Sequence, residues 1–430
     1  MGWLVIIGMD RNTLYSVLYR QQESFFEPKN LVSRDAVSKV LALLKLKLPV
    51  VITGIRRCGK SSLMVLVRDE LKLYKKNCIF VDFSDERLID FDHNDFEKIE
   101  SYLVENNYAK EVFFFIDEVQ EVMHWEKWVN RLKEKHQILI TGSNSKLLSK
   151  EIASTLTGRS TSLNLQPFGF KEFLFAKNTN LDNYLLDSKK QALIRRLFVE
   201  YSKNGGFPKM ILSNDETILR ELYENILYRD VVARLGKTLE RPVKELSANF
   251  LANPSSAVSS RRASELTGVK NLLTIKKVLS EFENSFLYIF ISKFDYSIRK
   301  QIQNPRKVYC SDNGFLTRLG FAFSDNEGKL LENIVAIELK RRLKETYYFS
   351  DSKECDFVIR EGNKIVAAIQ VTTKLSGENE ERELLGLLGA MSAFNLNEGL
   401  ILTNDQEEER QIENKKIILF PVWKWLLEKQ

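Results

Sequence analysis

The stretch that most restricts the fold of this chain is GIRRCGKS, residues 54–61, which matches the pattern G-x-x-x-x-G-K-[ST]. The apolar run LPVVITG leads into it, and the amphipathic run KSSLMVLVRDELKLY continues from it. A strand, a glycine-rich loop and a helix in that order surround a phosphate with backbone N–H groups and the positive end of a helix. The sequence therefore predicts a phosphate-binding loop, with a purely structural glycine turn as the alternative.

The loop also carries the side chains that a bound nucleotide needs. Lys60 is expected to neutralise the β- and γ-phosphates of ATP, and Ser61 to place its hydroxyl on Mg²⁺. We predict that ATP or ADP contacts the loop, the start of its helix and one serine after a later strand: Gly54, Ile55, Arg56, Arg57, Cys58, Gly59, Lys60, Ser61, Ser62 and Ser143.

A second apolar run, FFFIDE at residues 113–118, ends in two acids. A buried strand leaves its last residues at the carboxyl edge of the sheet, so Asp117 is expected beside the loop, where it would help to bind Mg²⁺. Glu118 is expected to orient and deprotonate the attacking water. An acidic strand end without a catalytic role is the alternative.

Two further segments offer groups for the γ-phosphate. Ser143 and Asn144 follow the next predicted strand and are candidate γ-phosphate sensors, with an ordinary polar loop as the competing interpretation. Arg159, in LTGRS, is a candidate catalytic arginine finger, acting in cis or from a neighbouring subunit. Arg56 and Arg57 are the alternatives for that charge.

The composition of the chain argues against membrane-spanning, secreted and zinc-binding proteins. Hydrophobic residues make up 44% of the chain and charged residues 28%, which is ordinary for a globular protein. No apolar run reaches the roughly 18 residues that span a bilayer, and the apolar start lacks the basic region of a signal peptide. The four cysteines have no paired spacing, and three histidines are too few for a zinc site. We therefore expect a cytoplasmic protein with no membrane partner.

Several segments together resemble one family. TGIRRCGKSSL, FIDEVQEVMHWEKWVNRLK, ITGSNSKLLSKEIASTLTGR and LQPFGFKEFL are similar to the AAA-type predicted ATPases of archaea and bacteria. The resemblance continues through NGGFPK, RDVVARLG, PRKVYCSDNGF and LLENIVAIELKRR, and covers roughly residues 30–375. Members carry a C-terminal domain of unknown function, built from a winged helix and a restriction-endonuclease-like fold. The resemblance implies ATP hydrolysis and homo-oligomers.

The pattern along the chain divides it into parts. Apolar and amphipathic runs alternate over residues 31–165, which predicts an α/β fold with a parallel sheet covered on both faces. We expect a P-loop ATPase domain at 30–168, a helical extension at 169–250, a winged helix at 251–308 and a nuclease-like α/β domain at 309–430. Residues 1–8 are expected to be a fraying strand or a misassigned start.

The net charge of +6 is concentrated in one segment. Between Arg261 and Lys307, ten lysines and arginines oppose four acids, an excess equal to that of the whole chain. A helix over 259–266, a turn at Gly268 and a second helix from about 271 predict a helix-turn-helix. The apolar face of the second helix is expected to be buried: Leu272, Ile275, Val278, Leu279 and Phe282.

The cations that remain on the other sides of these helices are candidates for DNA binding. They would contact the phosphates of double-stranded DNA, as winged helices do in the major groove. A winged helix that only spaces two domains is the alternative. The candidate residues are Arg261, Arg262, Lys270, Lys276 and Lys277.

The C-terminal stretch CDFVIREGNKIVAAIQVTTK predicts two strands joined by a turn. A nuclease of the PD-(D/E)XK type needs an upstream glutamate, an aspartate that opens a hairpin, and (D/E)-x-Lys on the next strand, and its carboxylates bind divalent metals. Glu332 or Glu338 fits the first place and Asp356 the second.

The third place of that motif is substituted. Gln370 has no charge, so the affinity for Mg²⁺ should fall, and Thr372 cannot replace an ammonium. Lys374 lies on the same face of the strand, but about 6.6 Å further along than residue 372, and would reach the site only across a bulge. We predict a degenerate domain, with an active metal nuclease as the alternative.

Together these features predict a DNA-associated, ATP-hydrolysing protein with Mg²⁺ as cofactor and a degenerate nuclease-like domain. Two alternatives stay open: an ATP-dependent metal nuclease that cuts DNA, and a slow nucleotide switch that regulates contacts with DNA or a partner.

Overall fold

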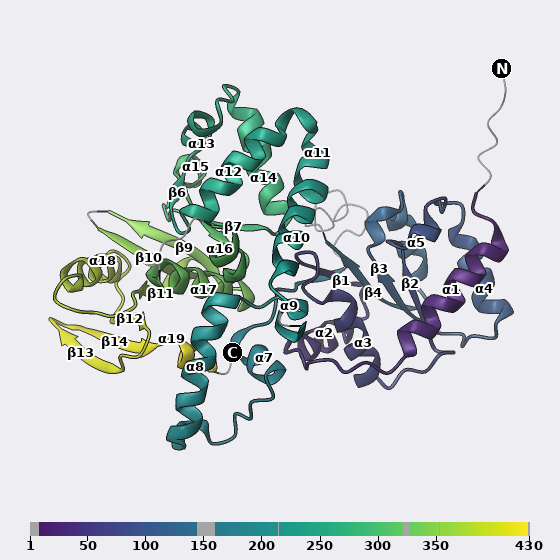
Figure 1. The fold of residues 1–430 in the computed structure, drawn as a ribbon, viewed down its shortest axis with the longest axis horizontal. Coiled ribbons are helices and arrows are strands. Elements are labelled where there is room, and N and C mark those ends of the chain that lie inside the picture. Colours follow the sequence, from purple (N-terminus) through teal and green to yellow (C-terminus); the bar gives the residue numbers. More distant parts are fainter. Residues whose placement is uncertain (1–7, 144–159, 214, 321–326, 352, 429–430) are drawn as a thin grey trace. The chain divides into compact units, whose positions relative to one another are not determined.

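The computed structural model describes residues 8–143, 160–213, 215–320, 327–351 and 353–428 (Figure 1). The chain divides into two compact units, Met1–Leu165 and Gln166–Gln430. Within the described ranges, no helix combines the length and the apolar character needed to cross a membrane.

The first unit is built on a parallel sheet of five strands in the order β2-β3-β4-β1-β5. The strands are β1 (Val50–Thr53), β2 (Cys78–Asp82), β3 (Phe113–Asp117), β4 (Gln137–Gly142) and β5 (Thr161–Asn164). Residues of β1 and β3 are buried throughout, as continuous apolar strands require. The predicted α/β class with a parallel sheet is confirmed in this unit.

In the described residues of this unit, five α-helices accompany the sheet: α1 (Arg11–Phe26), α2 (Ala36–Leu44), α3 (Lys60–Glu70), α4 (Phe96–Glu105) and α5 (Trp125–Leu132). Apolar residues of α1, α4 and α5 form one buried core with β2, β3 and β4. α2 contacts β1 and α3, while α3 also contacts β4. The loop that joins β1 to α3 is therefore anchored by packed elements at both ends.

Helix α1 precedes the expected start of the domain at residue 30 and was not predicted. Its Gln21 and Gln22 are buried and pair with the backbone of the edge strand β2. Gln22 accepts from the Phe80 N–H at 3.0 Å and donates to the Cys78 carbonyl at 2.8 Å, while Gln21 accepts from the Asp82 N–H at 3.0 Å. Two glutamines thus satisfy backbone groups that an edge strand would leave unpaired.

The second unit begins with a helical stretch, as the sequence predicted for residues 170–250. Its helices are α7 (Phe170–Ala176), α8 (Ser188–Asn204), α9 (Pro208–Ser213), α10 (Thr217–Asn225), α11 (Ala233–Leu235) and α12 (Glu240–Ala252). In the NGGFPK turn between α8 and α9, Gly206 leaves no space for a side chain, since a Cβ there would lie 2.2 Å from the Phe168 carbonyl oxygen.

A small antiparallel sheet and two helices follow α12. The sheet has the order β6-β8-β7, and its strands are β6 (Ala257–Val258), β7 (Tyr288–Ser292) and β8 (Arg306–Cys310). Helices α13 (Ser260–Thr267) and α14 (Leu272–Asn284) lie between β6 and β7 in the chain, and α15 (Ile298–Gln303) lies between β7 and β8. Gly268, at φ +70°, ends α13 and starts the turn that leads to α14.

The last part of the chain forms a mixed six-stranded sheet in the order β13-β14-β12-β11-β10-β9. Its strands are β9 (Glu345–Ser350), β10 (Glu354–Glu361), β11 (Lys364–Val371), β12 (Glu398–Thr403), β13 (Glu408–Ile412) and β14 (Lys415–Pro421). The helices of this part are α16 (Asn313–Leu319), α17 (Glu327–Arg341), α18 (Glu380–Ala393) and α19 (Val422–Trp425). β11, β12 and β14 run parallel, and the other neighbours are antiparallel.

Candidate functional site

The loop between β1 and α3 depends on its two glycines. Gly54 has a φ of +155°, and a Cβ there would lie 2.2 Å from the Leu165 carbonyl oxygen. Gly59 adopts φ 101° and ψ 28°, in the left-handed region, and directly precedes the first residue of α3. Both positions therefore exclude a side chain, one by contact and one by backbone conformation.

Lys60 is buried and points back along this loop. Its Nζ donates to the Gly54 carbonyl at 3.1 Å and lies 3.5 Å from Oε1 of Glu118. Arg34, also buried, donates to the Cys58 carbonyl at 2.9 Å and so supports the loop from outside. Sequence reasoning missed Arg34, because no motif connects a residue upstream of β1 to the loop.

Asp117 is the last residue of β3, and strand β4 lies between β3 and β1 in the sheet. Its carboxylate accepts hydrogen bonds from the hydroxyls of Ser61 and Thr141. Burial, followed by the charges of Glu118 and Asp82, raises the pKa of Asp117 to about 6. The strand order thus brings the last residue of β3 to the first turn of α3.

Glu118 follows β3 in the left-handed conformation, with φ 48° and ψ 46°. Its Oε2 accepts from the Ser143 N–H at 3.0 Å and from the Gln120 amide. Burial acts to raise the pKa of Glu118, but Lys60, Gln120 and Ser143 outweigh it and lower the pKa below its ordinary value. An ionised carboxylate held in a strained backbone conformation is typical of a functional position.

Asp82 is an acid of this edge that sequence reasoning missed. It ends β2 and pairs in register with Asp117. Burial raises its pKa, and the charge of Glu118 adds to that effect. The acid directly after the apolar run CIFV was the available signal. Asp82, Ser61 and Ser62 also line a pocket of about 290 Å³ beside α1 and α3.

The other residues predicted to contact the nucleotide differ in their exposure. Arg57 is exposed, with φ 64°, whereas Arg56 is partly buried and Ser143 is buried. Arg159 and Asn144 lie outside the described residues. The contacts of these residues with a nucleotide stay predictions.

The residues at this edge fit a magnesium ion. A hydroxyl and a carboxylate, from Ser61 and Asp117, lie within hydrogen-bonding distance. Oxygen ligands are those that Mg²⁺ prefers, and it usually completes its shell with water and phosphate oxygens. Burial and, after it, the negative charges of Glu118 and Asp82 raise the pKa of Asp117, and a dication would compensate that charge.

A second group of acids lies in the other unit, between α17 and β10. Glu332 and Asp356 both pair with Lys307 of β8. Gln370, on β11, accepts from the Asp356 N–H at 3.2 Å and donates to Glu383. The structure therefore brings together the three predicted nuclease-like residues, Glu332, Asp356 and Gln370, and adds a lysine that sequence reasoning missed.

The remaining candidates for that motif lie elsewhere. Glu338 pairs with Arg341 and Arg342, and Lys374 is exposed. Thr372 is buried, and its hydroxyl donates to the Lys374 carbonyl. Across the described part of the chain, no group of three or more His, Cys, Asp or Glu residues is arranged to hold a metal ion.

The helix-turn-helix carries the predicted basic residues on its surface. All five are exposed: Arg261, Arg262, Lys270, Lys276 and Lys277. The prediction that Leu272 is part of the core is wrong, because its side chain is 44% exposed. Leu272 is the first residue of α14, so it projects before the helix reaches the core that Ile275 and Phe282 enter.

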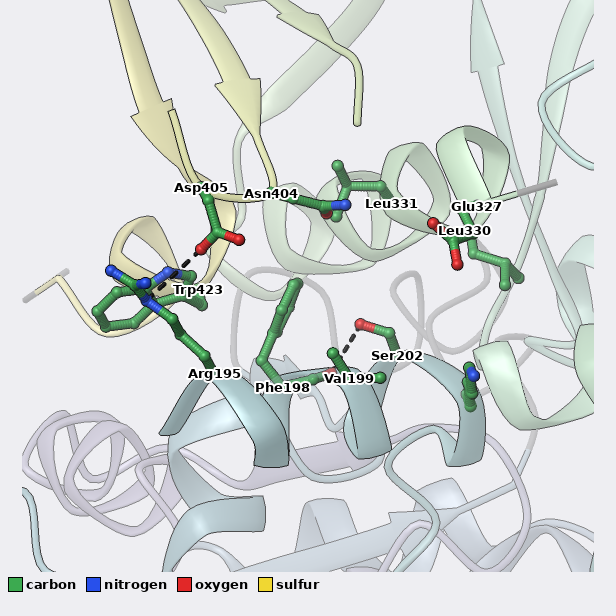
Figure 2. Close-up of a pocket in the computed structure, with 11 residues that line it drawn as sticks. Arg195, Phe198, Val199, Ser202, Glu327, Leu330, Leu331, Asn404, Asp405 and Trp423 are labelled. Carbon is green, nitrogen blue, oxygen red and sulfur yellow. Dashed lines mark hydrogen bonds and ion pairs between the residues drawn. The ribbon is translucent and has the colours of Figure 1, made fainter. Parts of the chain in front are cut away.

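A separate pocket of about 140 Å³ lies between α8, α17 and α19 (Figure 2). Phe198 and Leu331 contribute to its apolar wall, and Arg195 pairs with Asp405 at 3.5 Å at one side. The indole N–H of the buried Trp423 has no hydrogen-bond partner among the described residues. None of the predicted site residues that the structure describes lines this pocket.

The loop, the strand order and the acids at the end of β3 define an AAA-type P-loop domain. In agreement, residues 47–174 match the AAA domain family. Residues 195–326 and 327–425 match two domains of unknown function, DUF8612 and DUF4143.

Whole-chain relatives place the protein in a family. It is 32% identical to the uncharacterized protein MJ1544 of Methanocaldococcus jannaschii, across 97% of this chain and 96% of that protein. It is also 32% identical to an uncharacterized protein of Haemophilus influenzae, across 88% of this chain and 94% of that protein. The chain belongs to the family of these two proteins.

Among solved structures, the Walker-type ATPase PABY2304 of Pyrococcus abyssi is similar with a TM-score of 0.39 and 16% identity. The similarity covers 68% of this chain and 98% of that one.

Proposed function

We propose that the first unit binds ATP with Mg²⁺ and hydrolyses it. The observation that carries the proposal is the convergence of Lys60, Ser61, Asp117 and Glu118 at one edge of the sheet, with Lys60 Nζ 3.5 Å from Glu118. A cation for phosphates, a hydroxyl and a carboxylate for the metal, and an ionised base are the parts that hydrolysis of a phosphoanhydride requires.

Each residue has a defined task in this proposal. Lys60 gives up its bonds to the loop carbonyls and neutralises the β- and γ-phosphates. Ser61 and Asp117 would hold Mg²⁺, which neutralises charge that develops on the phosphate oxygens. Glu118, kept ionised by its lowered pKa, accepts a hydrogen bond from the attacking water and takes its proton. Arg159 is the proposed arginine finger.

The binding step is tested by titrating a fluorescent ATP analogue, with and without Mg²⁺, into the wild type and Lys60→Met. We expect binding to weaken at least tenfold in the variant, because an ion pair with the phosphates is lost. Lys45→Met, at an exposed lysine that directly follows α2, is the matched control and should bind as the wild type does. Equal affinities for the wild type and Lys60→Met would contradict the role of Lys60.

We further propose that residues 251–308 form a winged helix that binds duplex DNA. The chain order α12-β6-α13-α14-β7-α15-β8 and the small antiparallel sheet support the assignment. The exposed cations Arg261, Arg262, Lys270, Lys276 and Lys277 make no ion pair within the described residues. Their charge is therefore available to phosphates.

The DNA proposal is tested by measuring duplex affinity against salt concentration. Lys276→Gln/Lys277→Gln should weaken binding and make the salt slope shallower by up to about two units. Lys189→Gln/Lys364→Gln removes the same charge from exposed lysines outside this segment and should leave the slope unchanged. If the affinity of the wild type for duplex DNA hardly changed with salt concentration, the DNA-binding proposal would be contradicted.

The nuclease-like assignment of residues 309–430 is proposed on the order of its acids. Glu332 on α17, Asp356 on β10 and position 370 on β11 follow the order that a PD-(D/E)XK site needs. Because Gln370 replaces the third acid and residue 372 is a threonine, we propose a degenerate domain rather than an active nuclease.

A further inference from the structure

Lys307 is a buried lysine whose position no sequence motif predicts. It lies on β8, the central strand of the small sheet, where it pairs in register with Ala257 on one side and Ile291 on the other. Its side chain is only 4% exposed, although it carries a charge. The position of this ammonium is therefore fixed by a strand held at both edges.

Three carboxylates surround that ammonium. Nζ of Lys307 lies 3.0 Å from Oε1 of Glu332, 2.9 Å from Oδ1 of Asp356 and 2.8 Å from Oε1 of Glu354. Glu332 and Asp356 are the acids that the nuclease-like motif would use for a divalent metal. Lys307 therefore neutralises, from a different sheet, the oxygens that a metal would need.

The rest of the cluster fixes those oxygens further. Oδ2 of Asp356 accepts from the Val371 N–H at 3.1 Å, and Oε1 of Glu332 also accepts from the Tyr309 hydroxyl at 2.7 Å. Asp356 lies at an irregularity in the pairing of β10 with β9, between Cys355 and Val358. A bulge of this kind turns a side chain away from the regular alternation of its strand.

A divalent cation and this ammonium compete for the same place. A metal bound to Glu332 Oε1 and Asp356 Oδ1 would lie within a few ångströms of Nζ, where two positive charges repel strongly in a buried site. A metal would also need anionic ligands, and Gln370 offers none. The competition therefore favours the ammonium, which is covalently part of the chain.

We propose that Lys307 is the resident cation of this cluster and closes it to divalent metals. The carboxylates then connect the small sheet to the mixed sheet through an ion-pair network, and removal of the ammonium opens a divalent-metal site at Glu332 and Asp356. The proposal does not depend on ATP hydrolysis by the first unit.

The test counts bound Mn²⁺ by electron paramagnetic resonance in the full chain without nucleotide. All arms carry Asp117→Asn, which lowers binding at the nucleotide site. Lys307→Met, which preserves length and removes charge, should gain one Mn²⁺ per chain, bound at least tenfold more tightly than any Mn²⁺ in the parent. Adding Asp356→Asn should abolish that gain. Lys364→Met, an exposed lysine on β11, should gain none.

Two outcomes would overturn the proposal. One is a folded Lys307→Met that gains no Mn²⁺; the other is a parent protein that already binds one Mn²⁺ and loses it with Asp356→Asn. If Lys307→Met does not fold, the second comparison decides alone, because the proposal requires the parent and its Asp356→Asn variant to bind equal numbers of Mn²⁺.

Discussion

At the scale of single residues, Asp117 combines a proposed functional role with an electrostatic cost. Burial, Glu118 and Asp82 raise its pKa from 3.8 to about 6. A folded-state pKa above the ordinary value means that the fold loses stability as pH rises through about 6, where the carboxylate ionises. In the absence of a metal, the ionised carboxylate of Asp117, which is proposed to hold magnesium, therefore lowers the free energy of unfolding.

Asp117→Asn should therefore stabilise the protein without nucleotide or Mg²⁺. A shift from 3.8 to about 6 corresponds to about 3 kcal/mol as an upper figure at pH 8. The gain in the free energy of unfolding should shrink as pH falls below 6, because the wild-type carboxyl then becomes protonated. Urea denaturation at pH 5.5 and pH 8.5 measures it, with the exposed Asp90→Asn as control. A variant that is less stable at pH 8.5 would contradict this account.

Arg34 provides a second prediction at this scale. It donates to the Cys58 carbonyl at 2.9 Å and so fixes the loop between its two glycines. A hydrogen bond from a charged donor contributes about 1.5–3 kcal/mol, so Arg34→Met should weaken MgATP binding by roughly tenfold or more. Nucleotide titration measures the effect. Arg131→Met, which removes a charge from α5, should bind as the wild type does, and equal binding by both variants would argue against the role of Arg34.

At the scale of elements, α14 separates a buried face from an exposed start. Ile275 is fully buried and Leu272 is 44% exposed. Ile275→Ala should lower the free energy of unfolding by about 2–5 kcal/mol, because it removes methyl groups and leaves a cavity. Leu272→Ala should cost less than about 1 kcal/mol. Chemical denaturation of both variants checks the difference, and equal losses would mean that Leu272 belongs to the core after all.

The elements of the first unit show which parts of the fold the sequence predicts and which it does not. The GIRRCGKS loop and the run FFFIDE were located correctly because strands, glycines and terminal acids are local patterns. Helix α1 was missed because Gln21 and Gln22 occupy buried positions, where they serve the backbone of β2 rather than an apolar core. Its apolar residues alone give too weak a stripe to predict a helix.

Long-range contacts account for what the sequence did not predict in the sites. Lys307 lies 49 residues from Asp356 in the chain, and only the adjacent sheets bring its ammonium to that carboxylate. Asp82 meets Asp117 through the register of two parallel strands. Patterns of spacing identify residues on one element, whereas these pairs depend on how separate elements pack.

At the scale of the whole molecule, the proposed activities lie in different units. The residues proposed to bind the nucleotide belong to Met1–Leu165, and the basic segment with α13 and α14 and the carboxylate cluster belong to Gln166–Gln430. A slow nucleotide switch would couple them, so that a non-hydrolysable ATP analogue changes duplex affinity by about fivefold or more. Fluorescence anisotropy with and without the analogue measures this coupling, and an unchanged affinity would argue against a switch.

The most direct test of the central claim is phosphate release from MgATP by the wild type and Glu118→Gln. The account predicts measurable turnover by the wild type and a loss of roughly 10²-fold or more in the variant, with MgATP affinity retained, because only the base is removed. Glu111→Gln, an exposed acid before β3, should turn over as the wild type does. Equal turnover by the wild type and Glu118→Gln would contradict the assignment of Glu118 and, with it, the proposed mechanism.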